Sequence, residues 1–259
     1  MTPPAAPVFE ARGVTKRFAG LTAVNALDVR LNEREVLGLI GPNGSGKTTF
    51  FNVVNGVFPL SDGAVFHRDQ AITNWPAHRV AARGIARTFQ NTRVFANASA
   101  LENVLVGSHI HAELPLLHVI VGTREARRRE EAARTAALAH LETVGLSGRA
   151  DEIARNMPYG AIKRLEIARA LSMNPEILML DEPAAGLNPR EAGALMELVQ
   201  SLHARGMTIL IIEHNMRVVM GLCQRIVVID AGTKIAEGPP DAIRSDPRVR
   251  EAYLGKGAA

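Results

Sequence analysis

Apolar residues gather in short runs that predict the strands of a buried sheet. Residues 27–31 alternate between apolar and polar, which is the pattern of a half-buried strand. A turn at residues 230–232 with a return through 234–236 predicts a terminal hairpin. Strands covered on both faces are predicted by four continuous apolar runs, at residues 36–40, 177–180, 209–212 and 226–229.

A helix with clear boundaries separates two of these runs. Asn188 can cap its first turn, Pro189 fits the first helical position, and Glu191 completes a capping box. Apolar residues then recur at helical spacing until Gly206, where we expect the helix to end. The order strand, helix, strand predicts a parallel sheet with crossover helices, so the fold class is α/β.

The middle of the chain has a different pattern. Residues 99–148 contain no convincing strand, whereas residues 124–141 are rich in helix formers and hold opposite charges at i,i+4 spacing. The arginines at 127–129 therefore belong to the solvated face of a helix rather than to a binding patch. We expect an α-helical subdomain, over about residues 91–165, inserted into the α/β domain.

Composition narrows the class of protein. The chain has 259 residues and a formal net charge of +4, and its basic residues are dispersed, which argues against a nucleic-acid partner. Its single cysteine, Cys223, cannot form an internal disulfide, which fits a reducing cytosol. No apolar run approaches the ~20 residues of a membrane-spanning helix. Residues 1–7 resemble a flexible leader rather than a secretory signal, so we expect a soluble chain.

The segment after the first buried run matches the phosphate-binding P-loop pattern. Its glycines let backbone N–H groups surround a phosphate, and the following helix N-terminus adds a partial positive charge. We expect Lys47 to reach the β- and γ-phosphates of a nucleotide and the Thr48 hydroxyl to hold Mg²⁺. A glycine-rich turn without a ligand is the alternative, which the order strand, motif, helix disfavours. The predicted nucleotide-binding residues are Gly41, Pro42, Asn43, Gly44, Ser45, Gly46, Lys47, Thr48 and Thr49.

Two acids follow the apolar run 177–180, as in a Walker B element. A carboxylate at the carboxyl end of a buried strand points into the crevice where open α/β sheets bind their ligands. We expect Asp181 to hold Mg²⁺ through water and Glu182 to polarise an attacking water. Acids also end strands without a catalytic role, an alternative that the P-loop upstream disfavours.

Together with the segments between them, these motifs resemble the ATP-binding-cassette (ABC) family over residues 8–254. The resemblance implies a P-loop, RecA-like ATPase core with an antiparallel β portion at residues 8–240, and ATP and Mg²⁺ as cofactors. It also implies that Gln90 contacts Mg²⁺ and water, that His214 is the switch histidine, and that Phe18 stacks on adenine. Without the resemblance, Gln90 would be interpreted as an exposed loop amide, His214 as a core or surface histidine, and Phe18 as a core aromatic.

Residues 157–171 are similar to the signature motif of the family. Pro158 stands where the family has a serine that contacts the γ-phosphate, and Ala161 stands in place of a glutamine. Because Gly160 remains at the start of a helix, we expect backbone N–H groups to make this contact. The resemblance implies a head-to-tail dimer in which each ATP lies between one subunit's P-loop and the other's Pro158, Tyr159 and Gly160.

The resemblance favours a transporter subunit over other ABC proteins. Those that act on DNA carry long coiled-coil insertions and those that act on ribosomes carry two cassettes, and the chain has neither. We therefore expect transmembrane permease subunits as partners and a peripheral location at the cytoplasmic face of the plasma (inner) membrane. The competing hypothesis is a soluble ABC ATPase that acts as a switch on nucleic acid or the ribosome.

Three segments, at residues 158–170, 182–189 and 246–255, are similar to the ATPases of branched-chain amino acid importers. Residues 241–259 are the corresponding C-terminal tail, and residues 107–130 resemble an extra segment of the larger ATPase subunit of that family. The resemblance implies a second ATPase, a paralogue or a second copy, as dimer partner and indirectly a solute-binding protein. Relatives with similar tails serve urea, short amides or lipopolysaccharide export, so the solute stays open.

Three histidines, His109, His111 and His118, lie close together in the sequence. Their spacing fits no common zinc pattern, so we expect a solvated or partner-facing segment there. Residues 114–121 are apolar and either dock against another subunit or belong to the core.

Overall fold

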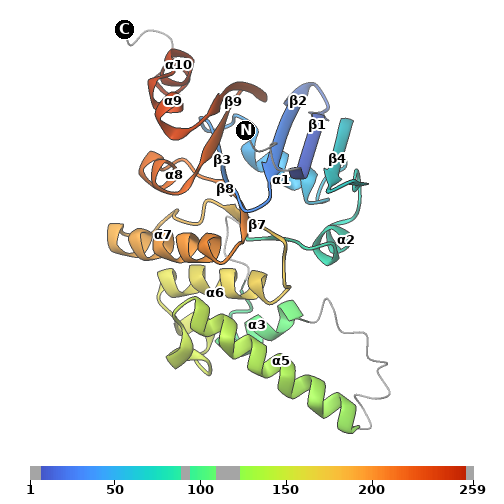
Figure 1. The fold of residues 1–259 in the computed structure, drawn as a ribbon, viewed down its shortest axis with the longest axis vertical. Coiled ribbons are helices and arrows are strands. Elements are labelled where there is room, and N and C mark those ends of the chain that lie inside the picture. The colour runs from blue at the N-terminus through green and yellow to red at the C-terminus, as the bar shows by residue number, and fades with distance from the viewer. Residues whose placement is uncertain (1–6, 89–93, 109–122, 255–259) are drawn as a thin grey trace, which may run out of the picture.

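Two β-sheets form one part of the molecule, and a group of helices forms the other (Figure 1). The computed structural model describes residues 7–88, 94–108 and 123–254. The larger sheet runs in the order β10 (Thr233–Gly238), β9 (Arg225–Asp230), β3 (Val36–Ile40), β8 (Thr208–Ile212), β7 (Ile177–Asp181) and β6 (Ile85–Arg87). The smaller, antiparallel sheet runs in the order β2 (Leu21–Asn32), β1 (Pro7–Phe18), β4 (Asp62–His67) and β5 (Gln70–Ala71).

Every residue of the central strand β3 is buried because both faces of its sheet are covered. Val36 and Ile40 belong to the hydrophobic core on the side of the helical part, whereas Leu37 and Leu39 belong to the core shared with the antiparallel sheet. Side chains alternate in direction along a strand, so one continuous apolar run serves two cores. The four predicted buried strands and the terminal hairpin are confirmed as β3, β7, β8, β9 and β10.

Helices cover both faces of the six-stranded sheet. The predicted capping box of α7 (Pro189–Ala204) is present: the Asn188 side chain accepts the Glu191 N–H at 3.0 Å, and the Glu191 carboxylate accepts the Asn188 N–H at 3.1 Å. No helix in the described ranges is both long enough and apolar enough to cross a membrane. The other helices of this part are α1 (Lys47–Val54), α2 (Ala77–Ala82), α8 (Met216–Leu222), α9 (Pro240–Ser245) and α10 (Pro247–Leu254).

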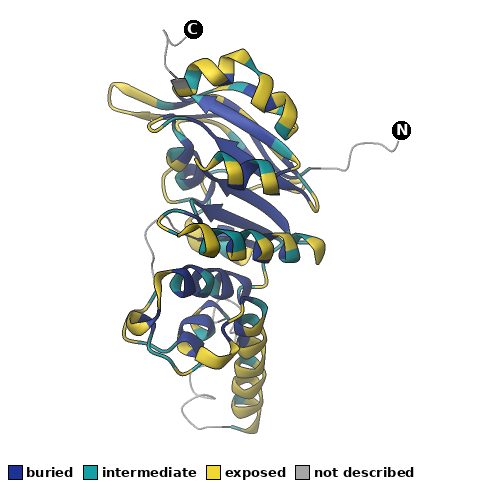
Figure 2. Cartoon of the chain, turned by 90° about the vertical axis from the view of Figure 1, so that its left-hand side faces the viewer, coloured by how far each residue is buried: buried dark blue, intermediate teal, exposed yellow. Residues whose placement is uncertain are grey.

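The helical part consists of α3 (Ala100–Ser108), α5 (Arg124–Thr143), α6 (Tyr159–Leu171) and two short 3₁₀ turns at Ser147–Arg149 and Ala154–Asn156. The helix predicted at residues 124–141 is therefore confirmed and ends two positions later. One side of α5 is buried against α3 and α6, and its outer side is exposed (Figure 2). At Gly107 the backbones of α3 and α6 approach so closely that a Cβ would lie 2.4 Å from the Arg169 carbonyl oxygen.

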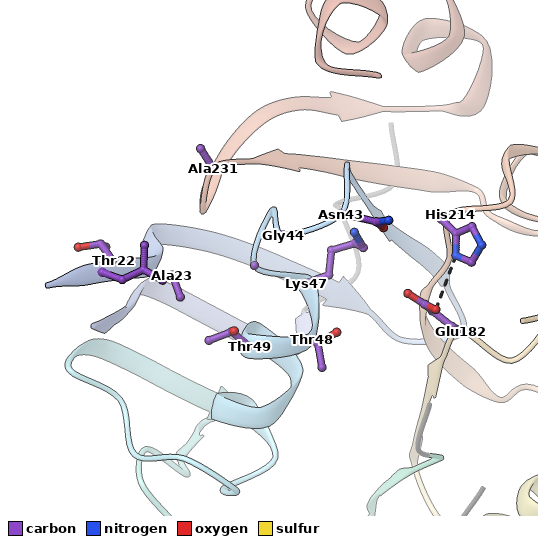
Figure 3. A pocket seen from close by; sticks show the side chains of 12 residues that line it. Thr22, Ala23, Asn43, Gly44, Lys47, Thr48, Thr49, Glu182, His214 and Ala231 are labelled. Atoms are coloured by element: carbon purple, nitrogen blue, oxygen red, sulfur yellow. Dashed lines mark ion pairs between the residues drawn. The ribbon is translucent and has the colours of Figure 1, made fainter. Parts of the chain in front are cut away.

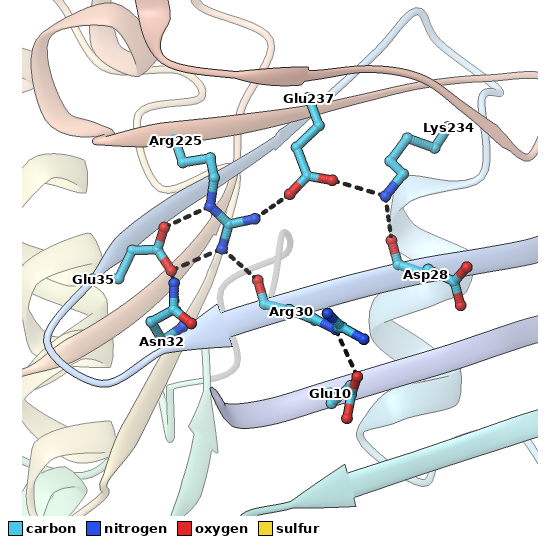
Figure 4. Close-up of polar contacts among 8 residues, drawn as sticks. All are labelled: Glu10, Asp28, Arg30, Asn32, Glu35, Arg225, Lys234 and Glu237. Atoms are coloured by element: carbon cyan, nitrogen blue, oxygen red, sulfur yellow. Dashed lines mark hydrogen bonds and ion pairs between the residues drawn. The ribbon is translucent and has the colours of Figure 1, made fainter. Parts of the chain in front are cut away.

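An ion-pair network joins the two sheets at their edges (Figure 4). Arg225 of β9 contacts both Glu35 oxygens, at 2.8 and 2.9 Å, and donates to the Arg30 carbonyl of β2 at 2.6 Å. It also contacts Glu237 of β10, whose other oxygen pairs with Lys234 at 2.7 Å. Because a guanidinium has several donors in one plane, a single arginine can hold three elements in register.

Candidate active site

Three strands end side by side at one edge of the six-stranded sheet. The strands β3, β8 and β7 run parallel, and Ile212 at the end of β8 pairs with both Leu39 and Asp181. The segments that follow these strands therefore leave the sheet at the same edge. This is where ligands bind in open α/β sheets, and it brings together motifs that lie far apart in the sequence.

The loop between β3 and α1 passes very close to neighbouring backbone. A Cβ at Gly41, where φ is 157°, would lie 2.0 Å from the Ile229 carbonyl oxygen. A Cβ at Gly46, where φ is 101°, would lie 2.3 Å from the Ala23 carbonyl oxygen. Only glycine fits these two positions, since both the backbone angles and the space exclude a side chain. The predicted P-loop conformation therefore depends on contacts with β2 and β9.

Lys47, the first residue of α1, is buried under this loop. Its Nζ donates to the carbonyl oxygens of Gly41 at 2.7 Å and Pro42 at 2.8 Å. Burial lowers the pKa of Lys47, and the nearby carboxylates of Glu182 and Asp181 oppose this effect. The ammonium group thus lies within the loop, with carbonyl contacts that phosphate oxygens can replace.

A cavity of about 760 Å³ opens above the loop (Figure 3). This volume lies in the range of small-molecule sites. The side chains of Lys47, Glu182 and His214 face it from three different segments. From the predicted P-loop its lining includes Asn43, Gly44, Gly46, Lys47, Thr48 and Thr49. The other lining residues are Leu21, Thr22, Ala23, Glu182, His214 and Ala231.

Glu182 is held in an unusual backbone conformation directly after β7. Its φ is 46°, which is uncommon for a residue other than glycine, and its N–H donates to the Ile212 carbonyl at 2.9 Å. Its Oε2 lies 3.6 Å from Nδ1 of His214. Strained backbone is found at functional sites, and here it turns the chain so that the Glu182 side chain faces the cavity.

Asp181, the last residue of β7, is almost fully buried. Its Oδ2 lies 2.6 Å from Nη2 of Arg87, and its Oδ1 is buried without a hydrogen bond from any described residue. Burial raises the pKa of Asp181, and the ion pair with Arg87 opposes this shift. A buried carboxylate oxygen with no donor fits a cation ligand, since hard cations such as Mg²⁺ take oxygen ligands.

The signature residues lie outside this cavity, next to the segment after Glu182. Tyr159 is 44% exposed, and a Cβ at Gly186 would lie 3.0 Å from its ring. A Cβ at Gly160 would lie 2.7 Å from a carboxylate oxygen of Glu191 on α7. Pro158, Tyr159 and Gly160 therefore do not contribute to the cavity of their own subunit.

Among the described residues, the predicted adenine contact Phe18 and the predicted metal-binding Asp181 do not line the cavity either. Phe18, at the end of β1, is 39% exposed and packs edge-on against Phe58, with ring centroids 5.6 Å apart. Gln90 lies outside the described residues, as do His109, His111 and His118. Within the described ranges, no group of three or more His, Cys, Asp or Glu side chains is arranged to hold a metal ion.

Several residues of the site were not predicted from the sequence. Leu21, Thr22 and Ala23 line the cavity from the start of β2, a strand predicted only from residue 27 onward. Glu213 is fully buried, and its carboxylate accepts the N–H groups of Ala184 at 2.8 Å and His214 at 3.2 Å. Burial raises the pKa of Glu213, and these N–H donors oppose the shift. An acid directly after an apolar strand was the available signal for it.

A phosphate-binding loop beside two strand-terminal acids is the arrangement of P-loop nucleotide-binding proteins. The sequence model of the ABC transporter family matches residues 24–185. That of the branched-chain amino acid ATP-binding cassette transporter matches residues 233–259. The chain belongs to the ABC transporter family and is one of its ATP-binding subunits.

Three similar proteins are ATP-binding proteins of transport or export systems. The chain is 43% identical over 251 residues to the high-affinity branched-chain amino acid transport ATP-binding proteins BraF of Pseudomonas aeruginosa and LivG of Escherichia coli strain K12, covering 96% of this chain and 98% of each relative. It is 34% identical to the lipopolysaccharide export system ATP-binding protein LptB of Acidithiobacillus ferridurans, covering 96% and 97%. A solved nucleotide-free cassette from an ABC transporter matches with a TM-score of 0.84 at 33% identity, covering 96% of this chain and all of that one.

Proposed function

We propose that this protein hydrolyses ATP to energise an importer of branched-chain amino acids. The proposed ATP hydrolysis rests on one observation. The side chains of Lys47, Glu182 and His214 converge on one cavity at the carboxyl edge of the sheet. The C-terminal match at residues 233–259 and the identity to BraF and LivG support the solute class.

Each residue of the site has a role in this proposal. Lys47 and the N–H groups of the P-loop bind the β- and γ-phosphates, and Thr48 and Asp181 hold Mg²⁺, with Gln90 as a further ligand. The buried Oδ1 of Asp181, which has no donor among the described residues, supports the metal site. Glu182 accepts a proton from the attacking water, and His214, whose Nδ1 lies 3.6 Å from Oε2 of Glu182, acts beside it in the same cavity. When bound, Mg²⁺ would neutralise part of the negative charge of the phosphates.

The proposed active form is a head-to-tail dimer. The signature residues Pro158, Tyr159 and Gly160 do not line the cavity of their own subunit, which supports a contact with ATP bound by another subunit. With Pro158 in place of a hydroxyl residue, backbone N–H groups at the start of α6 make the contact, helped by the helix dipole. The second subunit is a paralogous ATPase or another copy of this chain.

Transmembrane permease subunits and, indirectly, a solute-binding protein complete the proposed assembly at the cytoplasmic face of the inner membrane. Phe18 remains a proposed adenine contact, which requires nucleotide to sit beyond the lining of the present cavity.

Co-purification tests the proposed assembly. A tagged form of the chain is expressed from the native gene in the source organism and purified from detergent-solubilised membranes. The partner chains are then identified by mass spectrometry. We expect multi-span permeases, together with a second ATPase where the dimer partner is a paralogue. A reconstituted complex should take up radiolabelled leucine only with ATP. Recovery of a lipopolysaccharide-export complex, or of ribosomes or DNA without permeases, would replace this proposal.

A further inference from the structure

Arg87 connects three parts of the nucleotide site. It is the last residue of β6, and its Nη2 lies 2.6 Å from Oδ2 of Asp181 at the end of β7, with the side chains 6% and 1% exposed. Its Nη1 donates to Oδ1 of Asn52 at 2.8 Å, and its guanidinium carbon lies 5.3 Å from the centre of the Phe51 ring. Asn52 and Phe51 belong to α1, the helix that follows the P-loop.

The two oxygens of Asp181 have different surroundings as a result. Oδ2 contacts Arg87, whereas Oδ1 is buried and accepts no hydrogen bond from a described residue. The backbone around the pair is also held in place: the Asp181 N–H donates to Oγ1 of Thr88 at 3.3 Å, and the Thr88 N–H donates to the Met179 carbonyl at 2.9 Å. A carboxylate that is held through one oxygen presents the other in a fixed direction.

Stability alone does not explain this pair. A buried ion pair contributes little net stability compared with well-packed apolar residues of the same volume. Partners that orient a metal-binding side chain, in contrast, strengthen metal binding because the ligand is already in position when the cation arrives. The planar guanidinium suits this task, since it contacts Asp181 and Asn52 in one plane.

We propose that Arg87 is a positioning residue for cation binding: it holds Oδ2 of Asp181 so that Oδ1 is directed to Mg²⁺. The inference rests on the proposed function, in which Asp181 holds Mg²⁺ beside the nucleotide. Arg87 itself touches neither nucleotide nor cation. Because its other anchor lies on α1, it also sets the position of Asp181 relative to the P-loop helix.

A metal titration tests this role. The full-length protein is saturated with a fluorescent ATP analogue in EDTA and then titrated with Mg²⁺, and the affinity for the analogue without Mg²⁺ is measured separately. For Arg87→Met, which keeps much of the side-chain volume, we expect Mg²⁺-free affinity to be unchanged and the Mg²⁺ concentration for half-saturation to rise about 10-fold or more. An unchanged or lower Mg²⁺ requirement overturns the proposal, as does an equal loss of Mg²⁺-free affinity.

Two further variants keep the test decisive. Arg87→Lys preserves the charge but loses the planar fork, so we expect a smaller rise, about threefold, in the Mg²⁺ requirement. If Arg87→Met does not fold, as judged by circular dichroism, an unchanged requirement in Arg87→Lys overturns the proposal instead. Asn52→Ala removes only the anchor on α1, and we expect it to shift the requirement in the same direction as Arg87→Lys.

A fourth variant separates this inference from the proposed function. Asp181→Asn should abolish the Mg²⁺ response that the native protein shows. If native protein and Asp181→Asn respond alike, the assignment of Asp181 as a cation ligand is wrong. If only the Arg87 variants behave like native protein, the role of Arg87 is wrong and the metal site stands.

Discussion

Nδ1 of His214 lies 3.6 Å from Oε2 of Glu182, although the two residues follow different strands. The pairing of Asp181 with Ile212 in neighbouring parallel strands places them side by side. The Glu182 side chain is 13% exposed and that of His214 is 52% exposed, so the acid is sheltered while the histidine remains accessible from the cavity. Contacts of this length commonly tighten when substrate binds.

Glu182→Gln should separate binding from hydrolysis. We expect steady-state ATP turnover to fall at least about 100-fold, since the amide cannot accept a proton from water, while affinity for ATP is retained. The variant should also accumulate as an ATP-bound dimer, which sedimentation velocity can detect. Glu197→Gln, at an exposed position on α7, is the matched control and should behave like native protein. Normal turnover by Glu182→Gln would show that Glu182 is not the general base.

His214→Ala tests whether the histidine and Glu182 act as a unit. We expect a loss of turnover of about 100-fold with little change in nucleotide affinity. Because groups that act together give non-additive effects, the double variant with Glu182→Gln should be hardly slower than the slower single variant. Turnover numbers from a coupled-enzyme assay give the comparison. Fully multiplicative losses would mean that the two residues act independently.

Tyr253 links the C-terminal helix to the P-loop. Burial, the larger effect, raises the pKa of its phenol, whereas the Gly41 backbone lies close enough to the hydroxyl to lower this pKa. We expect Tyr253→Phe to weaken ATP binding about fivefold, corresponding to the ~1 kcal/mol of one polar contact with the loop. Arg250→Ala, an exposed substitution on the same helix, is the control. Equal affinity of Tyr253→Phe and native protein, by titration with a fluorescent ATP analogue, would show that this contact does not support the loop.

The buried thiol of Cys223 should make the free energy of unfolding depend on pH. The thiol is buried beneath β3, and burial raises its pKa from 9.0 to about 12. Between these values the folded protein keeps the proton that the unfolded chain loses, so the contribution of the thiol is present below pH 9 and decreases as pH rises. The decrease reaches up to about 1.4 kcal/mol per pH unit.

Urea unfolding at pH 8 and pH 10 measures this effect by comparing native protein with Cys223→Ala. We expect the stability difference between the two proteins to change by about 1 kcal/mol in favour of the alanine variant as pH rises. All other titrating groups are shared, so their effects cancel in the comparison. A difference that does not depend on pH would show that the buried thiol does not titrate on unfolding.

Apart from residues 27–31 of β2, the antiparallel sheet could be expected only from family resemblance, and its strands show why. In β1 and β2 the pairing shifts register several times, between Ala11 and Val14 for example, and each shift breaks the alternation of apolar and polar residues. The strand β6 has three residues, which is too short for any periodicity. The conformation of these strands therefore depends on pairing with their neighbours in the sheets, because their own sequences lack a regular alternating pattern.

The sequence by itself determined the buried strands, the capped helix α7, the P-loop and the acids Asp181 and Glu182, because these depend on side chains close together along the chain. Only the tertiary structure decided that Arg87 contacts Asp181, 94 positions away, and that Tyr253 reaches Gly41. Such contacts follow from strand register and helix packing, which depend on the whole core at once.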